Sequence, residues 1–378
     1  MRTSSDSSLQ GDRGLRDDVA LMRMHRRAVL LSSASIGLAL CGGVCSRGGV
    51  SKTRGAEAAR LTPVQLAKRP PTERVAMVAL DSAGPRSEAE PRVRQLTKAV
   101  GGDSHGLIAV GLALGAPLFS GGRAPKQLQI MQSFPGDLLD PARSHGDAVV
   151  QVEGATAVEV SEAVRRILEA SPDWVLRWRI DGFRSGNHHD QGRGLARNPF
   201  HFTDGFGNPS SAQETLDRML VRSDQDEPDW AVGGTYQVIR VVRLATELWN
   251  KDSVEEQERI MGRRRDGRWL DGTPAGEEPN FAADPQGRLT PLDSHVRLAA
   301  PDRRNPPPIV RRSYTYDRGN GDTGLIFSCF QRDLSKGFEA VQRRLEGEAM
   351  AKYMLTTGGG YFFVPPPGDA WIDSVFHG

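Results

Sequence analysis

The sequence predicts an α+β fold organised as two domains. Short apolar strand candidates are separated by a few helix candidates, and strands next to one another in sequence look antiparallel. This order of elements occurs twice along the chain. The length of 378 residues allows two or three domains. We therefore expect a leading segment over residues 1–58, a first domain over 61–215 and a second domain over 230–378.

The first half shows the pattern of strands and helices clearly. Thr156 and Glu159 form a T-x-x-E capping box ahead of apolar residues at helical spacing, which predicts the start of a helix. The stretch 185–194 is polar and glycine-rich and is expected to be a loop. A helix is expected over 90–100, and strands are expected over 74–81, 106–114, 146–155 and 174–183.

The second half repeats this organisation without repeating the sequence. Ser253 and Glu256 suggest a second capping box, and residues 265–310 form a long polar insertion rich in Pro and Gly. A helix is expected over 336–347, and strands are expected over 233–249, 312–317 and 323–331.

Composition and charge limit the class of function. The formal net charge of +2, with 25% charged residues of both signs, gives no reason to expect a nucleic-acid partner. Hydrophobic content of 38% fits a globular enzyme or binding protein. The cysteines Cys41, Cys45 and Cys329 form no zinc or disulfide pattern in the body of the chain. Cys329 lies in the apolar run LIFSCF and is expected to be buried.

The N-terminal segment has the pattern of an export signal. Residues 1–27 are polar and basic and end in Arg26-Arg27, directly before a mild apolar run over 28–45. Ala56-Glu57-Ala58 resembles a cleavage site. A twin arginine in this position predicts export through the Tat machinery to the periplasm, the cell envelope or the medium. The alternatives are a membrane anchor and a lipoprotein cysteine. The lipoprotein cysteine is less favoured, because the residues directly before Cys41 and Cys45 do not suit such a site.

The stretch FHFTDGFGNPS, residues 200–210, contains a single carboxylate, Asp204. Its glycines and the Asn208-Pro209 step predict a turn. An aspartate in a turn commonly caps its own backbone. The residues alone leave open whether Asp204 stabilises the loop or moves a proton.

Among the histidines, His295 has the most informative context. It lies in LDSHVRLAAP, where the long irregular insertion becomes apolar, so it is expected to be brought inside as a core residue or a ligand. A metal bound by this histidine alone would need other ligands, and a porphyrin supplies four. His188 and His189 lie in the glycine-rich stretch, where a solvated loop is favoured over a metal site.

Several segments together resemble one known family. They occur in order at the expected spacing: FTDGFGNP, GGTYQVIR, WNKDSVEEQERIMGRRRDG, DSHVRLAAP, IVRRSYTY, GLIFSCFQRDLSKGF and GGGYFF. On these motifs the chain resembles the dye-decolourising peroxidases, and within them the exported bacterial deferrochelatase/peroxidase subgroup. The resemblance is close over residues 120–365. It implies two ferredoxin-like domains and one haem b (iron protoporphyrin IX), held mainly by the second domain.

The resemblance assigns roles to individual residues. His295 resembles the proximal haem ligand, and Asp204 and Arg311 resemble the distal pair. A carboxylate can take a proton from one oxygen of peroxide and return it to the other. An arginine keeps its charge and can stabilise the negative charge that develops as the O–O bond breaks. The further matches are Arg263 to a propionate contact, Leu325 and Phe327 to the distal pocket wall, and Glu348 to the carboxylate that accepts from the proximal histidine.

The function implied by the resemblance is an exported haem peroxidase. Its partners would be hydrogen peroxide and a small aromatic or porphyrin substrate, such as a dye or phenol, oxidised one electron at a time. The alternatives are a deferrochelatase that releases iron from haem, a haem carrier with low turnover, and a haem-free scaffold. Trp249, Trp269 and Tyr236 could relay electrons, although packing is the more ordinary role. The oligomeric state stays open, with a homo-oligomer among the alternatives.

Two departures from the family pattern are visible. His201 stands where the distal motif begins with glycine, which commonly marks a tight backbone. This histidine could face outward or add a second titrating group near the peroxide. The first domain is shorter than usual around residues 101–114, so we expect it to lack either a strand or a loop.

Overall fold

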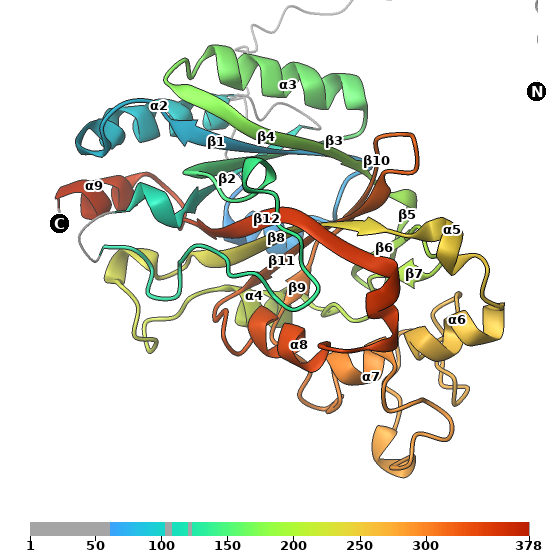
Figure 1. Cartoon of the computed structure of the whole chain (residues 1–378). Coiled ribbons are helices and arrows are strands. Elements are labelled where there is room, and N and C mark those ends of the chain that lie inside the picture. Colours follow the sequence, from blue (N-terminus) through green and yellow to red (C-terminus); the bar gives the residue numbers. More distant parts are fainter. Residues whose placement is uncertain (1–60, 103–107, 120–122, 378) are drawn as a thin grey trace, which may run out of the picture. The chain divides into compact units, whose positions relative to one another are not determined.

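The computed structural model describes residues 61–102, 108–119 and 123–377, which belong to one compact unit (Figure 1). Residues 1–58, over which an export signal is predicted and which include Cys41 and Cys45, lie outside the described residues. Within the described part, no helix is both long enough and apolar enough to cross a membrane.

The first half of the chain forms a ferredoxin-like βαββαβ unit. Its four strands pair antiparallel in the order β4-β1-β3-β2. The apolar residues of α3 at helical spacing, which follow the predicted capping box of Thr156 and Glu159, face this sheet. The elements are β1 (Arg74–Ser82), α2 (Ala89–Gly102), β2 (Ala109–Gly115), β3 (Ala148–Gly154), α3 (Ala157–Glu169) and β4 (Trp174–Phe183).

The second half repeats this strand order as β12-β8-β11-β10. Its strands and helix are β8 (Thr235–Leu244), β9 (Val310–Arg311), β10 (Tyr314–Asp317), β11 (Thr323–Gln331), α8 (Phe338–Arg344) and β12 (Met354–Val364). The long insertion between β8 and β9 carries α5 (Thr246–Trp249), α6 (Val254–Met261) and α7 (His295–Ala299). The strand expected over 233–249 therefore ends at Leu244, and a short helix follows it.

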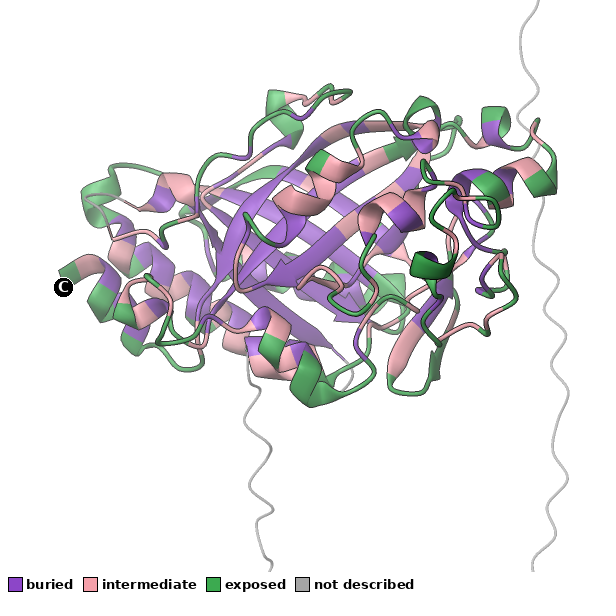
Figure 2. Cartoon of the chain, turned by 90° about the horizontal axis from the view of Figure 1, so that it is seen from below, coloured by how far each residue is buried: buried purple, intermediate pink, exposed green. Residues whose placement is uncertain are grey.

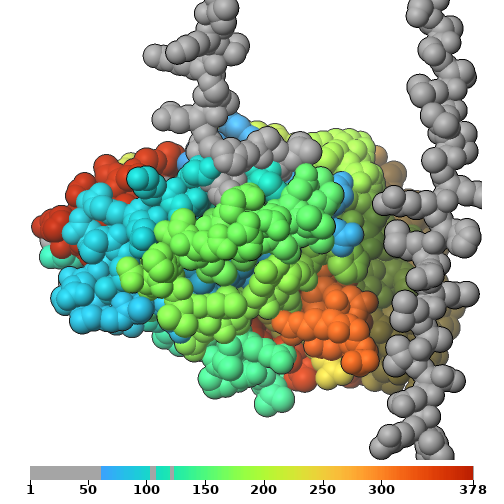
Figure 3. Space-filling model, turned by 90° about the horizontal axis from the view of Figure 1, so that it is seen from above, coloured from blue at the N-terminus to red at the C-terminus, as the bar shows by residue number. Residues whose placement is uncertain are grey.

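The two sheets join at both edges into a closed ring of strands. Strand β2 pairs with β12, and β10 pairs with both β11 and β4. Figure 3 shows the outer side of the first sheet, where α2 and α3 form the surface and the orange β10–β11 hairpin lies beside the green residues of β4. Closure removes the open sheet edges at which other chains could pair.

Most residues of β1, β2, β3, β8 and β12 are buried on both faces, as the purple ribbons of Figure 2 show, whereas β4 has several exposed residues. Along β1, Ala76, Val78 and Leu80 pack under α2 and α3, whereas Val75 and Met77 point into the ring. A buried ion pair also lies among the described residues of this core: Arg312 donates from Nε to Glu153, at 2.6 Å. The helices of the insertion and α8 lie on the outer face of the sheet formed by the second half (Figure 1).

A separate small sheet is formed by residues that follow β4 in the sequence. It consists of β5 (Ser185–Asp190), β6 (Arg193–Arg197) and β7 (Thr203–Asp204). The expectation of a loop over 185–194 is therefore wrong: His188 and His189 pair with β6, although both side chains are exposed. The remaining helices of the described residues are α1 (Pro63–Lys68), α4 (Ala212–Met219), α9 (Ala370–His377) and short 3₁₀ segments at 86–88, 116–118, 141–143, 229–231, 281–283 and 349–353.

The expected α+β class with two ferredoxin-like halves is confirmed. The expectation that the first domain lacks a strand is wrong, because all four strands and both helices of that unit are present. The domain bounds at 61–215 and 230–378 stay a prediction. Cys329 is buried, as expected. Ser253 caps α6 by accepting from Glu256 N–H, but the Glu256 side chain pairs with Arg259 and so completes no capping box.

Candidate active site

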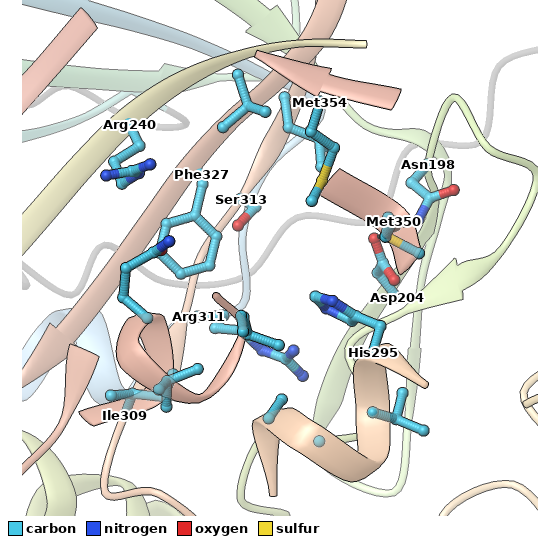
Figure 4. Close-up of a pocket in the computed structure, with 18 of the residues that line it drawn as sticks. Asn198, Asp204, Arg240, His295, Ile309, Arg311, Ser313, Phe327, Met350 and Met354 are labelled. Atoms are coloured by element: carbon cyan, nitrogen blue, oxygen red, sulfur yellow. Dashed lines mark hydrogen bonds between the residues drawn. The ribbon is translucent and has the colours of Figure 1, made fainter. Parts of the chain in front are cut away.

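A cavity of about 570 Å³ lies against the outer face of the sheet formed by the second half of the chain. Its size falls in the range of small-molecule and cofactor pockets. Strands β8, β9, β11 and β12 supply one side, and α7, α8 and the loop before β7 supply the others (Figures 1 and 4). All seven residues to which the family resemblance assigns a haem or peroxide role line this cavity: Asp204, Arg263, His295, Arg311, Leu325, Phe327 and Glu348.

His295 is the first residue of α7 and projects into the cavity (Figure 4). Its Nδ1 lies 2.7 Å from Oε2 of Glu348, whose side chain is 3% exposed. Since a carboxylate only accepts, Nδ1 carries the hydrogen and donates it. Within the described residues, Nε2 has no hydrogen-bond partner. This nitrogen is therefore available to a ligand in the cavity.

The charge on His295 reflects its burial and its neighbours. Burial opposes protonation, but the charge and hydrogen bond of Glu348 outweigh it and raise the pKa of His295. The positive charge of Arg311 acts in the opposite direction, and the negative charge of Asp204 acts with Glu348. The carboxylate thus fixes the orientation of the ring and increases its electron donation.

Helix α7 has only five residues and depends on the insertion around it. Arg297 donates to the Asp284 side chain at 3.1 Å and to the carbonyl of Thr290 at 2.7 Å. Arg344 of α8 donates to the carbonyls of Leu298 and Ala299 at the end of α7. These bonds hold His295 in place although the segment has little regular structure.

Asp204 ends β7, and both of its carboxylate oxygens accept a hydrogen bond. Oδ1 accepts from Nη2 of Arg263 at 2.9 Å, and Oδ2 accepts from Nδ2 of Asn198 at 2.9 Å. The Asp204 side chain is 45% exposed, so it meets the cavity and the solvent. The carboxylate is held by side chains and caps no backbone N–H in its turn. Asp204 therefore does not stabilise the loop as a backbone cap.

Arg311 lies on β9 and reaches into the cavity below Phe327 (Figure 4). Its backbone is clamped by Asn208, whose Oδ1 accepts from Arg311 N–H at 2.9 Å and whose Nδ2 donates to Arg311 carbonyl at 2.7 Å. Burial lowers the pKa of Arg311, and the charge of Asp204 opposes this. An arginine still stays charged at working pH. The turn therefore fixes the aspartate and the arginine relative to one another.

Two glycines allow this close packing. A Cβ at Gly207 would lie 2.5 Å from Nη2 of Arg311, so a larger residue there would require the guanidinium or the turn to shift. Gly262 ends α6 with φ of 87°, and a Cβ there would meet Ser294 at 2.6 Å. This turn brings the neighbouring Arg263 next to α7.

Arg263 is buried and has a free donor. Its guanidinium lies 5.3 Å from the centre of the Phe202 ring, and Nη2 donates to Asp204. Nη1 is buried without a hydrogen-bond partner among the described residues. Burial lowers the pKa of Arg263, although Asp204 opposes this. A buried cationic donor without a partner fits an acidic group of a ligand, as the propionate assignment requires.

The donor set as a whole fits a haem. An available imidazole nitrogen backed by a carboxylate suits iron in a porphyrin, which supplies its other four ligands. The apolar wall suits the macrocycle and includes Leu325, Phe327, Met350 and Met354. The free Nη1 of Arg263 suits a carboxylate.

Comparison with known proteins agrees with this site. Residues 103–184 match the model of the N-terminal part of Dyp-type peroxidases, and residues 195–369 match the model of the C-terminal part. The chain belongs to the dye-decolourising peroxidase family. It is therefore a haem-dependent enzyme of the peroxidase class.

Relatives and solved structures support the assignment over most of the chain. The deferrochelatases of Escherichia coli K12 and Shigella flexneri are each 36% identical over 321 residues, which cover 78% of this chain and 74% of theirs. A DyP-type peroxidase from Streptomyces coelicolor matches with a TM-score of 0.72 and 28% identity, covering 82% of this chain and 94% of its own. One from Cellulomonas bogoriensis matches with a TM-score of 0.69 and 29% identity, over the same shares.

Some residues considered in the sequence lie elsewhere. His201 is exposed and does not line the cavity. Its φ of 70° lies in the left-handed region that favours glycine, the residue that the family resemblance predicts at this position. Trp269 lines the cavity, whereas Trp249 and Tyr236 are fully buried in hydrophobic clusters and do not line it. Their role as electron relays stays a prediction.

Sequence reasoning missed Asn198 as a contact of Asp204 and Asn208 as the clamp on Arg311. Both precede a proline, which signals a turn, but only the fold shows which charged residue each one contacts.

Proposed function

We propose that the chain is an exported haem peroxidase in which His295 binds the iron of haem b and Asp204 and Arg311 act on hydrogen peroxide. The observation that carries this proposal is the shared cavity. It brings the imidazole of His295 with a free Nε2, the carboxylate of Asp204 and the guanidinium of Arg311 together beside an apolar wall. Haem, when bound, supplies redox-active iron that passes oxidising equivalents to substrates one electron at a time.

Asp204 is proposed to move the peroxide proton. Its carboxylate is partly exposed and held in one orientation, so it can accept the proton of one peroxide oxygen and return it to the other. Arg311 keeps its charge and presents fixed donors where negative charge develops as the O–O bond breaks. Leu325 and Phe327 would exclude water from the macrocycle, and Arg263 would pair with a propionate.

The test is Asp204→Asn, which keeps the size of the side chain and removes the base. We expect unchanged haem content and a fall of about 10²–10⁴-fold in the rate of reaction with peroxide. The rate is measured by stopped-flow absorbance, and dye oxidation follows turnover. An unaltered peroxide rate in this variant would show that Asp204 is not the base.

A second candidate is the release of iron from haem with the porphyrin left intact. It is favoured by the name of the curated relatives at 36% identity, which are deferrochelatases. Two protons would replace the iron, so incubating the protein with excess haem and a chelator that binds ferric iron would yield metal-free protoporphyrin and chelated iron in equal amounts. A haem carrier would instead retain haem and show negligible reaction with peroxide. The substrate would be a porphyrin for a deferrochelatase and a small aromatic reductant for a peroxidase.

Export by the twin-arginine route is proposed from Arg26-Arg27, the apolar run over 28–45 and the Ala56-Glu57-Ala58 step. This route carries folded proteins, which suits an enzyme that takes up its cofactor before export. Fractionation of cells that produce the full chain and the Arg26→Lys/Arg27→Lys variant tests it. Equal amounts of both proteins outside the cytoplasm would contradict the proposal.

A further inference from the structure

Asn198 lies at the centre of the loop that carries Asp204. Its Nδ2 donates to Oδ2 of Asp204 at 2.9 Å, and its Oδ1 accepts the backbone N–H groups of Phe200 and Phe202, each at 3.0 Å. Figure 4 shows the amide pointing at the carboxylate from the β5–β7 side of the cavity. One side chain therefore organises the loop with its oxygen and the carboxylate with its nitrogen.

The backbone of Asn198 closes the same loop. Its N–H donates to the carbonyl of Phe202 at 2.9 Å, and its carbonyl accepts from His201 N–H at 2.9 Å. The chain turns back within five residues, which requires the positive φ of His201. Phe200 and Phe202 are buried against Trp249, so the loop is also anchored by packing.

The carboxylate of Asp204 is thus held from two sides. Arg263 donates to Oδ1 and Asn198 donates to Oδ2, so the group cannot rotate about its χ2 torsion without losing one of the bonds. We propose that Asn198 is a positioning residue for Asp204, which fixes the orientation in which the carboxylate meets peroxide. This inference rests on the proposed role of Asp204.

An amide is suited to this position because it is neutral. It donates without exchanging a proton at working pH, so it does not compete with peroxide for the carboxylate. The other groups that interact with the charge of Asp204 are titratable or cationic: Arg184, Arg263, His295 and Arg311. A carboxylate in place of the amide would add a like charge and favour the protonated form of Asp204.

The test is Asn198→Asp in the holoprotein. The new side chain retains an oxygen that accepts from Phe200 and Phe202, but it loses the donor and places a second carboxylate beside Asp204. We expect unchanged haem content, a fall of about 10–100-fold in kcat/KM for peroxide, and an acid limb of the rate profile displaced to higher pH. The KM for the reducing dye should stay unchanged.

The matched control is Asn320→Asp, which makes the same chemical change at an exposed position of the β10–β11 hairpin with φ of 51°. It should behave like the parent protein. Asn198→Ala removes both functions of the side chain, and is expected to lower the melting temperature as well as the rate per bound haem.

The outcomes separate this inference from the proposed function. If Asn198→Asp loses haem or stability but keeps the parent rate per bound haem and the parent pH profile, the residue is only structural and the inference is wrong. If Asn198→Asp and Asp204→Asn both keep the parent rate, the role of Asp204 itself fails. If only Asp204→Asn loses rate, Asp204 stands as the base and Asn198 does not position it.

Discussion

Nδ1 of His295 donates to a carboxylate oxygen of Glu348 across 2.7 Å, although the two residues are 53 positions apart. Glu348→Gln keeps the shape but removes the charge. We expect haem still to bind, with affinity or activity lower by about 10–100-fold. The reduction potential of the bound haem should rise, because a less electron-rich imidazole stabilises oxidised iron less well. Spectroelectrochemistry measures this, and an unchanged potential would show that the pair does not tune the cofactor.

Removing the guanidinium of Arg311 should slow the reaction with peroxide while leaving haem bound. We expect Arg311→Leu to lower the peroxide rate by about 10²–10³-fold, because the fixed donors aimed at the developing charge are lost. Arg304→Leu, at an exposed arginine of the insertion that precedes β9, is the control and should keep the parent rate. Equal rates for both variants would remove Arg311 from the mechanism.

Gly207 is expected to control the position of that guanidinium. A methyl group there would lie 2.5 Å from Nη2 of Arg311 and would push it away from the cavity or displace the turn. Gly207→Ala should therefore lose peroxide reactivity with haem content retained. Gly101→Ala is the matched control, since a Cβ at Gly101 meets nothing within 4 Å. A Gly207→Ala variant with the parent rate would contradict the close approach seen here.

The segment before α7 should loosen in acid. Hydrogen bonds from the backbone of Thr290, Arg288 and Leu289, with one from Arg297, lower the pKa of Asp284 below 3.8. A depressed pKa gives stability that is present above the unfolded-state value and is lost as pH falls through the folded-state value. Haem release, followed by absorbance, should thus begin only below about pH 4. Asp284→Asn should release haem faster than the parent protein at neutral pH. Equal release by the parent and the variant would show that Asp284 does not stabilise the segment that carries His295.

Much of the fold could be predicted from local patterns. The capping box at Thr156 and the period-two strands depend on neighbouring residues, and these elements appear as expected. The ring closure through β10 depends on a single pairing of Thr315 with Phe183, far apart in sequence. The β5–β6 hairpin was missed because its residues are polar on both faces, so no alternation marked it.

The site was predicted from motif resemblance rather than from periodicity. Asp204, His295 and Arg311 come from three separate segments, and only the folded chain brings them to one cavity. The two adjacent arginines of IVRR show the limit of local reasoning. Alternation places them on opposite faces, and the structure shows that Arg311 takes the cavity while Arg312 pairs with buried Glu153.

The absorbance spectrum of purified His295→Ala tests the central claim most directly. The parent protein should show a Soret band that changes on addition of peroxide. If His295 is the ligand, the variant should lack the band at equal protein concentration, because the porphyrin iron would lose its protein ligand. Exogenous imidazole, which can occupy the vacated space, should restore part of it. A Soret band of parent position and intensity in His295→Ala without imidazole would contradict the assignment of His295 as the haem ligand.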